Sequence, residues 1–256
     1  MEFIYIYILI GLIGGITAGM LGLGGGIIFV PGLLLVHKFT GHFDGYQLQA
    51  AVYTSIVCII FAGSSSAYFH LRNNLINFEL VKRYAFVVSL GCLSGIFILE
   101  HISSESLEVI YSIILVILAL LLMSDAKIIK SNIRILRSVG QFYFLLNGII
   151  SSLMGIGGGT LSVPYISFLT SDIKESIATA SVIGLIIAGT SIIFMYLINS
   201  DIFSSKINHL SLLIIIPASI LGSYIGVTML NKIDSEKVKI IFSTLLIFIA
   251  IYVFID

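Results

Sequence analysis

The sequence predicts an all-α, polytopic membrane protein built from two homologous halves. Of its 256 residues 58% are hydrophobic and only 10% are charged, and the mean hydropathy of +1.14 is too high for a soluble domain. A glycine-rich phrase at residues 22–31 returns 133 positions later at residues 155–164, with six of its ten positions identical. An internal repeat of this kind predicts two structurally related units.

Eight apolar segments follow one another along the chain, and most have the roughly 20 residues that cross a bilayer core. They are residues 3–36, 48–69, 81–99, 107–124, 137–170, 176–198, 207–231 and 238–255. All thirteen Asp and Glu residues lie between the segments or at their edges, where the cost of burying a charge places them. The first run lacks a basic region and a cleavage pattern, so we expect a retained segment. The pattern predicts a multi-pass protein of the cytoplasmic (inner) membrane, surrounded by lipid.

Two of these segments, residues 3–36 and 137–170, are too long for a single upright crossing. One helix of 34 residues would measure about 51 Å, against a hydrocarbon core of about 30 Å. The glycine phrase lies in the middle of each, and a run of glycines followed by a proline weakens a helix. Each segment is therefore predicted to be interrupted, either as a tilted, broken crossing or as a hairpin that folds back at the glycines.

The placement of Lys and Arg separates these two topologies. Single crossings put eight basic residues on one side and five on the other, whereas hairpins leave only Lys38 and Lys206 outside and eleven inside. Cytoplasmic loops are enriched in Lys and Arg, so the count favours hairpins. Three full crossings then remain per half, which predicts inverted repeats. The expected organisation is a first transmembrane repeat (residues 1–124), a basic cytoplasmic linker (125–136) and a second transmembrane repeat (137–256).

The glycine phrases are the predicted binding site. An interruption at membrane depth is tolerated only where protein or a water-filled cavity encloses it. Past the glycines a helix is expected to restart, and the free N–H groups of a helix start attract anions. Two such starts, one from each half, are predicted to meet around one small anion. The predicted substrate-binding residues here are Gly22, Gly24, Gly25, Gly26, Pro31, Gly155, Gly157, Gly158, Gly159, Thr160 and Pro164.

Neutral polar residues outside the phrases supply further candidates. Thr54, Ser55 and Ser181 are predicted substrate contacts, although a hydroxyl in a helix also bonds back to its own backbone. His70 is a candidate for proton exchange or substrate contact, with a place at the membrane interface as the alternative. Asn147 fits a helix-packing hydrogen bond as well as a substrate contact.

Other glycines are predicted to serve helix packing instead. Gly11, Gly15 and Gly19 repeat at four-residue spacing, and Gly91 and Gly95 are spaced in the same way. Small residues at this interval let two helices approach closely in a membrane.

Several function classes are not supported. Cys58 and Cys92 lie in apolar segments without a CxxC or His-rich context, so no metal or cofactor is expected. A net charge of zero argues against nucleic acid. An intramembrane enzyme is not expected, because the spans lack paired aspartates and only Ser94 and His101 suggest a serine protease. A homo-oligomer is compatible with the sequence.

These features resemble the sulfite exporter TauE/SafE family, also described as a toluenesulfonate uptake permease family. The resemblance lies in the two glycine phrases ending in Val-Pro, in an Ala-x-x-Thr-Ser motif at residues 51–55, and in His70. The second half departs from it, with residues 178–181 in place of the full motif and Tyr196 where His70 aligns. The resemblance covers nearly the whole chain.

The resemblance implies secondary transport of a small, sulfur-containing anion of the sulfite or sulfonate class by alternating access. Backbone dipoles and hydroxyls suit such an oxyanion and would serve a cation poorly. No GxxxxGK[ST] motif for ATP binding occurs, which agrees with a secondary mechanism. An anion channel built on the same broken-helix backbone is the alternative.

Overall fold

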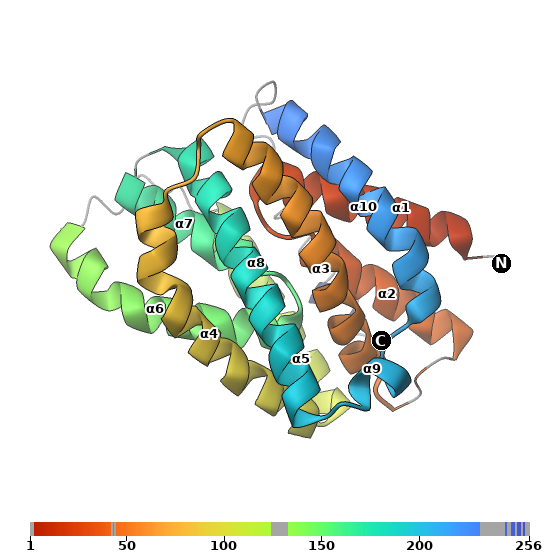
Figure 1. The fold of residues 1–256 in the computed structure, drawn as a ribbon. Helices are drawn as coiled ribbons and strands as arrows, with labels where there is room; N and C mark the ends of the chain where they lie inside the picture. Colours follow the sequence, from red (N-terminus) through yellow and green to blue (C-terminus); the bar gives the residue numbers. More distant parts are fainter. Residues whose placement is uncertain are drawn as a thin grey trace.

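The computed structural model describes residues 3–41, 43, 45–123, 133–170 and 172–230, and also 244, 247, 248, 250, 251 and 253. Within these residues the chain is helical and contains no strand (Figure 1), so the all-α prediction is confirmed. The helices are α1 (Ile4–Leu21), α2 (Gly26–Thr40), α3 (Gln47–Arg72), α4 (Phe78–His101), α5 (Ser104–Met123), α6 (Ile133–Met154), α7 (Gly159–Thr170), α8 (Ile173–Ile198), α9 (Ile202–Ser205) and α10 (His209–Leu230).

The helices follow the predicted apolar segments. Five of them, α1, α3, α4, α8 and α10, are long and apolar enough to cross a membrane, and shorter apolar stretches form α2 and most of α6. The chain is therefore a multi-pass membrane protein. Most of the last predicted segment, residues 238–255, and most of the predicted linker, residues 125–136, lie outside the described residues.

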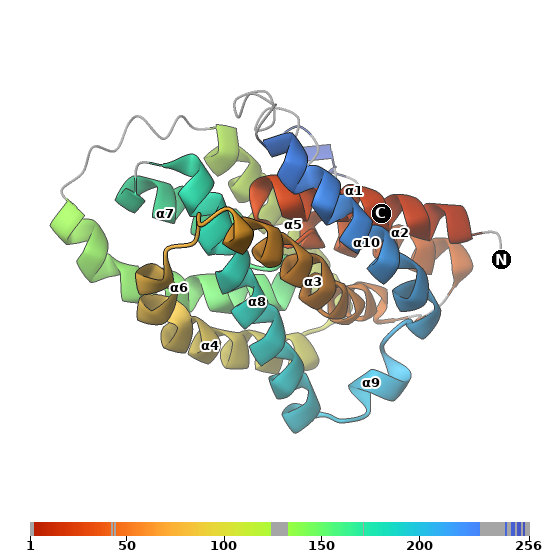
Figure 2. The ribbon, with the colours of Figure 1, turned by 45° about the horizontal axis from the view of Figure 1, so that its top comes forward.

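Both long segments are interrupted at their glycines and fold back as hairpins. The first becomes α1 and α2, and the second becomes α6 and α7. In Figures 1 and 2 the ends of α1 and α2 that lie away from the glycines point to one end of the bundle. The corresponding ends of α6 and α7 point to the opposite end.

Helices of the two halves pack on each other in a reciprocal pattern. The first helix of each half packs on the other half: α1 lies along α10, and α6 lies along α4. The central helices α3 and α8 contact each other, and α3 also packs on α2 and α10, as α8 packs on α7 and α4. The hairpins are therefore held in the bundle by contacts with the opposite half (Figure 1).

The glycines predicted to serve packing do so. A methyl group added to Gly15 of α1 would lie 2.2 Å from the carbonyl oxygen of Ser219 in α10. One added to Gly91 of α4 would lie 2.2 Å from the carbonyl oxygen of Leu145 in α6. Backbones this close leave no room for a side chain, so this prediction is confirmed for both helix pairs.

Candidate functional site

The two interruptions have the same backbone conformation. Gly22, Gly24 and Gly25 have φ of 67°, 71° and 81°, and their counterparts Gly155, Gly157 and Gly158 have φ of 63°, 73° and 71°. Residues with a Cβ rarely adopt this left-handed region, whereas glycine does so freely. In each phrase the new helix starts at the next residue, Gly26 or Gly159, as predicted.

The interruptions lie against each other inside the molecule. A methyl group on Gly26 would lie 2.1 Å from the carbonyl oxygen of Gly155, and one on Gly159 would lie 1.8 Å from that of Gly22. Gly24 and Gly157 also approach closely, since a Cβ on either would lie 3.3 Å from the other's Cα. Residues 22–26 and 155–159, which we call the glycine junction, are all buried.

Each side of the junction begins a helix with unused backbone donors. In α2 the first amides to find an acceptor are those of Ile28 and Phe29, both on the Gly25 carbonyl at 3.0 Å. In α7 the amide of Gly159 bonds to the Gly157 carbonyl at 2.9 Å, and that of Ser162 bonds to the Gly158 carbonyl at 3.0 Å. The N–H groups of Gly26 and Ile27 have no acceptor among the described residues, as expected at a helix start. The helices continue through Pro31 and Pro164.

Thr160, the second residue of α7, carries an unused side-chain donor. Its hydroxyl has no hydrogen-bond partner in the described part of the chain, and the residue is only 1% exposed. A buried hydroxyl without a partner is unfavourable, so each one in a native protein calls for an explanation. A bound ligand would supply the missing acceptor.

The second hairpin carries polar side chains that the first lacks. Asn147 of α6 donates from Nδ2 to Ser162 Oγ at 2.8 Å and to the Gly158 carbonyl at 3.3 Å. The Asn147 Oδ1 accepts from Ser151 Oγ at 2.8 Å. This network ties α6 to the start of α7. At the equivalent positions of the first hairpin stand Gly14, Ala18 and Phe29.

The predicted hydroxyls of α3 and α8 are engaged with protein backbone. Ser55 Oγ donates to the Gly155 carbonyl at 2.8 Å and so joins α3 to the junction. Thr54 Oγ1 bonds back to the Ala50 carbonyl at 2.8 Å, and Ser181 Oγ bonds to the Ala178 carbonyl at 2.7 Å.

His70 lies in the last turn of α3, with its side chain inside the bundle. The residue is fully buried, and its Nε2 lies 3.2 Å from the Gly19 carbonyl of α1. Its Nδ1 has no partner among the described residues. The imidazole therefore contacts the first hairpin one turn before the glycine junction.

A comparison with known families decides the identity. The model of the sulfite exporter TauE/SafE family matches residues 7–253, which is nearly the whole chain. The chain belongs to the TauE/SafE family. No solved structure matches it.

Curated relatives of this TauE/SafE protein are named as membrane transporters. "Probable membrane transporter protein YunE" of Bacillus subtilis is 28% identical, covering 97% of this chain and 96% of the relative. A "Probable membrane transporter protein" of Haemophilus influenzae is 27% identical over 99% and 98% of the two chains. "Probable membrane transporter protein MJ0441" of Methanocaldococcus jannaschii is 26% identical over 93% and 91%.

Two asparagines of the TauE/SafE protein were missed by the sequence reasoning. The backbone N–H of Asn77, before α4, donates to Thr179 Oγ1 at 3.0 Å. The backbone N–H of Asn208, before α10, donates to Thr54 Oγ1 at 3.2 Å. Each asparagine also caps its helix, accepting from Leu80 and Ser211 respectively. An Asn directly before an apolar helix is a recognisable N-cap signal. Only the fold reveals that both contacts join opposite halves.

Proposed function

We propose that this membrane transporter of the TauE/SafE family is a secondary carrier of a small, sulfur-containing oxyanion across the cytoplasmic membrane. The anion binds at the glycine junction, and access alternates between the two sides. The observation that carries the proposal is the meeting of two helix starts beside the buried hydroxyl of Thr160, which has no partner in the part of the chain that the structure describes. Helix starts favour anions, and the name of the family points to sulfite.

The two halves are inverted repeats in this proposal. The hairpins that open toward opposite ends of the bundle support it, and so does the reciprocal packing of α1 on α10 and of α6 on α4. Inverted repeats with interrupted helices at their interface suit alternating access, because the two halves can exchange conformations around a fixed site.

This topology predicts the sides of two loops. Ser103, between α4 and α5, should face the outside, and Asn74, between α3 and α4, should face the cytoplasm. A membrane-impermeant thiol reagent should therefore label Ser103→Cys in intact cells, and should label Asn74→Cys only after permeabilisation. The native cysteines, Cys58 and Cys92, are buried and should give little background. Labelling of Asn74→Cys in intact cells would reverse the proposed orientation.

The substrate site is tested by Thr160→Val, which removes the hydroxyl and keeps the shape of the side chain. Since this hydroxyl bonds to none of the described residues, the melting temperature without substrate should stay the same or rise. Uptake of radiolabelled sulfite into proteoliposomes should fall about tenfold or more in kcat/KM, because a hydrogen bond to a charged ligand contributes about 1.5–3 kcal/mol.

The matched control is Ser223→Ala. Ser223 in α10 is equally buried, and its hydroxyl likewise has no partner among the described residues, but its backbone packs against Gly19 of α1, outside the glycine junction. This variant should transport like the wild type. Normal kcat/KM in Thr160→Val would rule out the hydroxyl contact. If the wild type takes up an organosulfonate but not sulfite, the substrate is an organosulfonate, which is within the proposed class. Single-channel currents would show that the protein is a channel and not a carrier.

A further inference from the structure

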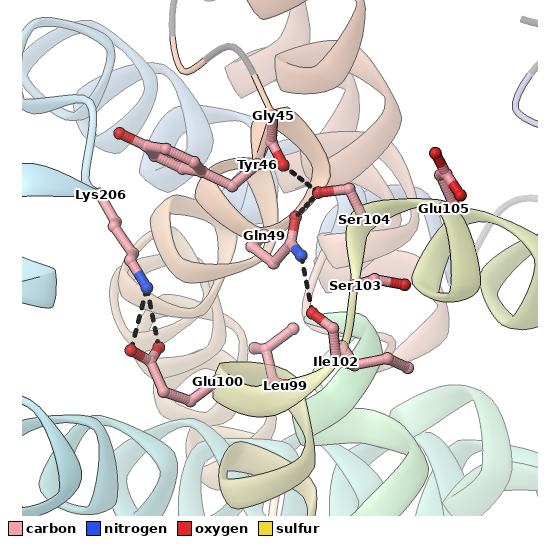
Figure 3. A pocket seen from close by; sticks show the side chains of 10 residues that line it. All are labelled: Gly45, Tyr46, Gln49, Leu99, Glu100, Ile102, Ser103, Ser104, Glu105 and Lys206. Carbon is pink, nitrogen blue, oxygen red and sulfur yellow. Dashed lines mark hydrogen bonds and ion pairs between the residues drawn. The ribbon is translucent and has the colours of Figure 1, made fainter.

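A second polar site lies at the end of the bundle where α3 and α5 begin and α4 and α8 end. It is a cavity of about 540 Å³ whose lining includes Glu100, Ser104, Glu105 and Lys206 (Figure 3). This site shares no residue with the glycine junction. Lys206 is the one cation among the residues that line the cavity.

The Glu100 carboxylate at the end of α4 receives bonds from three side chains. Tyr53 of α3 donates its hydroxyl at 2.6 Å, and Asn199, after α8, donates Nδ2 at 2.7 Å. Lys206 Nζ lies 3.0 Å from each carboxylate oxygen. Glu100 belongs to the first half, whereas Asn199 and Lys206 belong to the second. The cluster therefore joins the halves at this end.

Replacing Glu100 by another anion as the partner of Lys206 would cost little stability. The side chains of Lys206 and Glu100 are 25% and 13% exposed, and part-exposed ion pairs add little stability. If Lys206 turned away, Glu100 would keep its bonds from Tyr53 and Asn199 and would not become an unpaired buried charge. An incoming anion would then compensate Lys206.

The other polar side chains of the lining are bonded to protein. The Ser104 hydroxyl donates to the Gly45 carbonyl and to Gln49 Oε1, the latter at 3.1 Å, and Gln49 Nε2 donates to the Ile102 carbonyl at 3.3 Å (Figure 3). The second N–H of the Gln49 amide is the donor that they leave for an anion. Figure 3 shows Glu105 on the opposite side of the cavity from Lys206, with its carboxylate pointing away. Glu105 therefore repels an anion beside Lys206 less than a carboxylate next to the ammonium group would, because the repulsion falls with distance.

We propose that this cavity is an anion-docking site in which a small oxyanion and the Glu100 carboxylate compete for Lys206. The oxyanion class rests on the proposed function; the competition rests on the ion pair itself. Docking transfers Lys206 from Glu100 to the ligand and so removes one contact between the halves. In the proposed topology the site lies at the external entrance.

The test measures local anion attraction without transport. Ser103, which is exposed and lines the cavity, is replaced by cysteine in the full chain reconstituted in liposomes. The modification rates of two methanethiosulfonate reagents are compared, one bearing a sulfonate and the other a trimethylammonium group. Their ratio cancels differences in exposure of the thiol and reports the attraction of an organic sulfonate.

Opposite effects are expected from the two members of the ion pair. Lys206→Gln should lower the sulfonate-to-ammonium ratio about fivefold or more, and Glu100→Gln should raise it by a similar factor because Lys206 is released. With Lys206→Gln already present, Glu100→Gln should change the ratio by less than about twofold, because no cation remains at position 206 for the anion and Glu100 to compete for. Glu105→Gln, the matched control, should have the same small effect with and without Lys206→Gln.

If Glu100→Gln has the same effect with and without Lys206→Gln, the Glu100 charge acts only through long-range repulsion, and the proposal is overturned. An unchanged ratio in Lys206→Gln would overturn it as well. Lys206→Arg keeps the cation and should keep the ratio, which guards against a folding defect in Lys206→Gln. The Thr160→Val result is independent of this ratio, so either proposal can fail while the other stands.

Discussion

Gly159→Ala is expected to abolish transport and to lower the free energy of unfolding by about 3 kcal/mol. The added methyl group would lie 1.8 Å from the Gly22 carbonyl oxygen and 2.7 Å from the Leu23 Cα. Both are backbone atoms of the opposite interruption, so the two hairpins must move apart. Gly159 is helical, where alanine is otherwise the better residue by up to about 1 kcal/mol. Any loss therefore comes from the close approach.

The measurements are the melting temperature in detergent and sulfite uptake in proteoliposomes. Gly63→Ala in α3 is the matched control. A methyl group at this helical glycine would first meet Leu185 Cδ2 at 3.2 Å, the end of a flexible side chain. The control should keep both its stability and its uptake. A Gly159→Ala protein as stable as the wild type would show that the junction is looser than described.

Asn147→Leu is expected to destabilise the protein by roughly 2–4 kcal/mol and to lower uptake more than tenfold. Leucine has a similar size but leaves the buried hydroxyls of Ser151 and Ser162 without their partner. Each buried group left unpaired costs about 1–3 kcal/mol. The start of α7 also loses both bonds from Asn147 and keeps the bond of the Tyr143 hydroxyl to the Leu161 carbonyl, so its position at the junction is held less firmly.

Ser162→Ala should lower stability and uptake less than Asn147→Leu does, because it removes only one of these bonds. Asn73→Leu serves as the control, since Asn73 is exposed and its side chain makes no hydrogen bond among the described residues. Stability is measured without substrate. A stable Asn147→Leu protein with impaired uptake would instead favour a direct substrate contact by Asn147, the alternative that the sequence left open.

The helices themselves were predictable from local sequence. Each predicted apolar segment in the described ranges forms one helix or one interrupted pair, because burying backbone in lipid requires helices. The interruptions were also predictable, since Gly24, Gly25, Gly157 and Gly158 need positive φ and no other residue type adopts it as easily. The substrate role of these residues stays a prediction.

The hydrogen-bond partners of the candidate hydroxyls were not predictable. Thr54 and Ser55 are neighbours in sequence, yet one bonds within α3 and accepts from Asn208, whereas the other donates to Gly155 in the opposite half. Such contacts depend on the rotation of a helix about its axis and on the partner that packs against it. The spacing of residues in the sequence determines neither the rotation nor the partner.

The sequence by itself determined a helical membrane protein with two related halves, each interrupted at a run of glycines, because hydropathy and backbone freedom are local properties. Only the tertiary structure decided that the interruptions touch and that α1 and α6 pack on the opposite half. It alone paired Glu100 with Lys206, which are 106 positions apart in the chain. These contacts are long-range, and their geometry is set by how closely the helix backbones can approach one another.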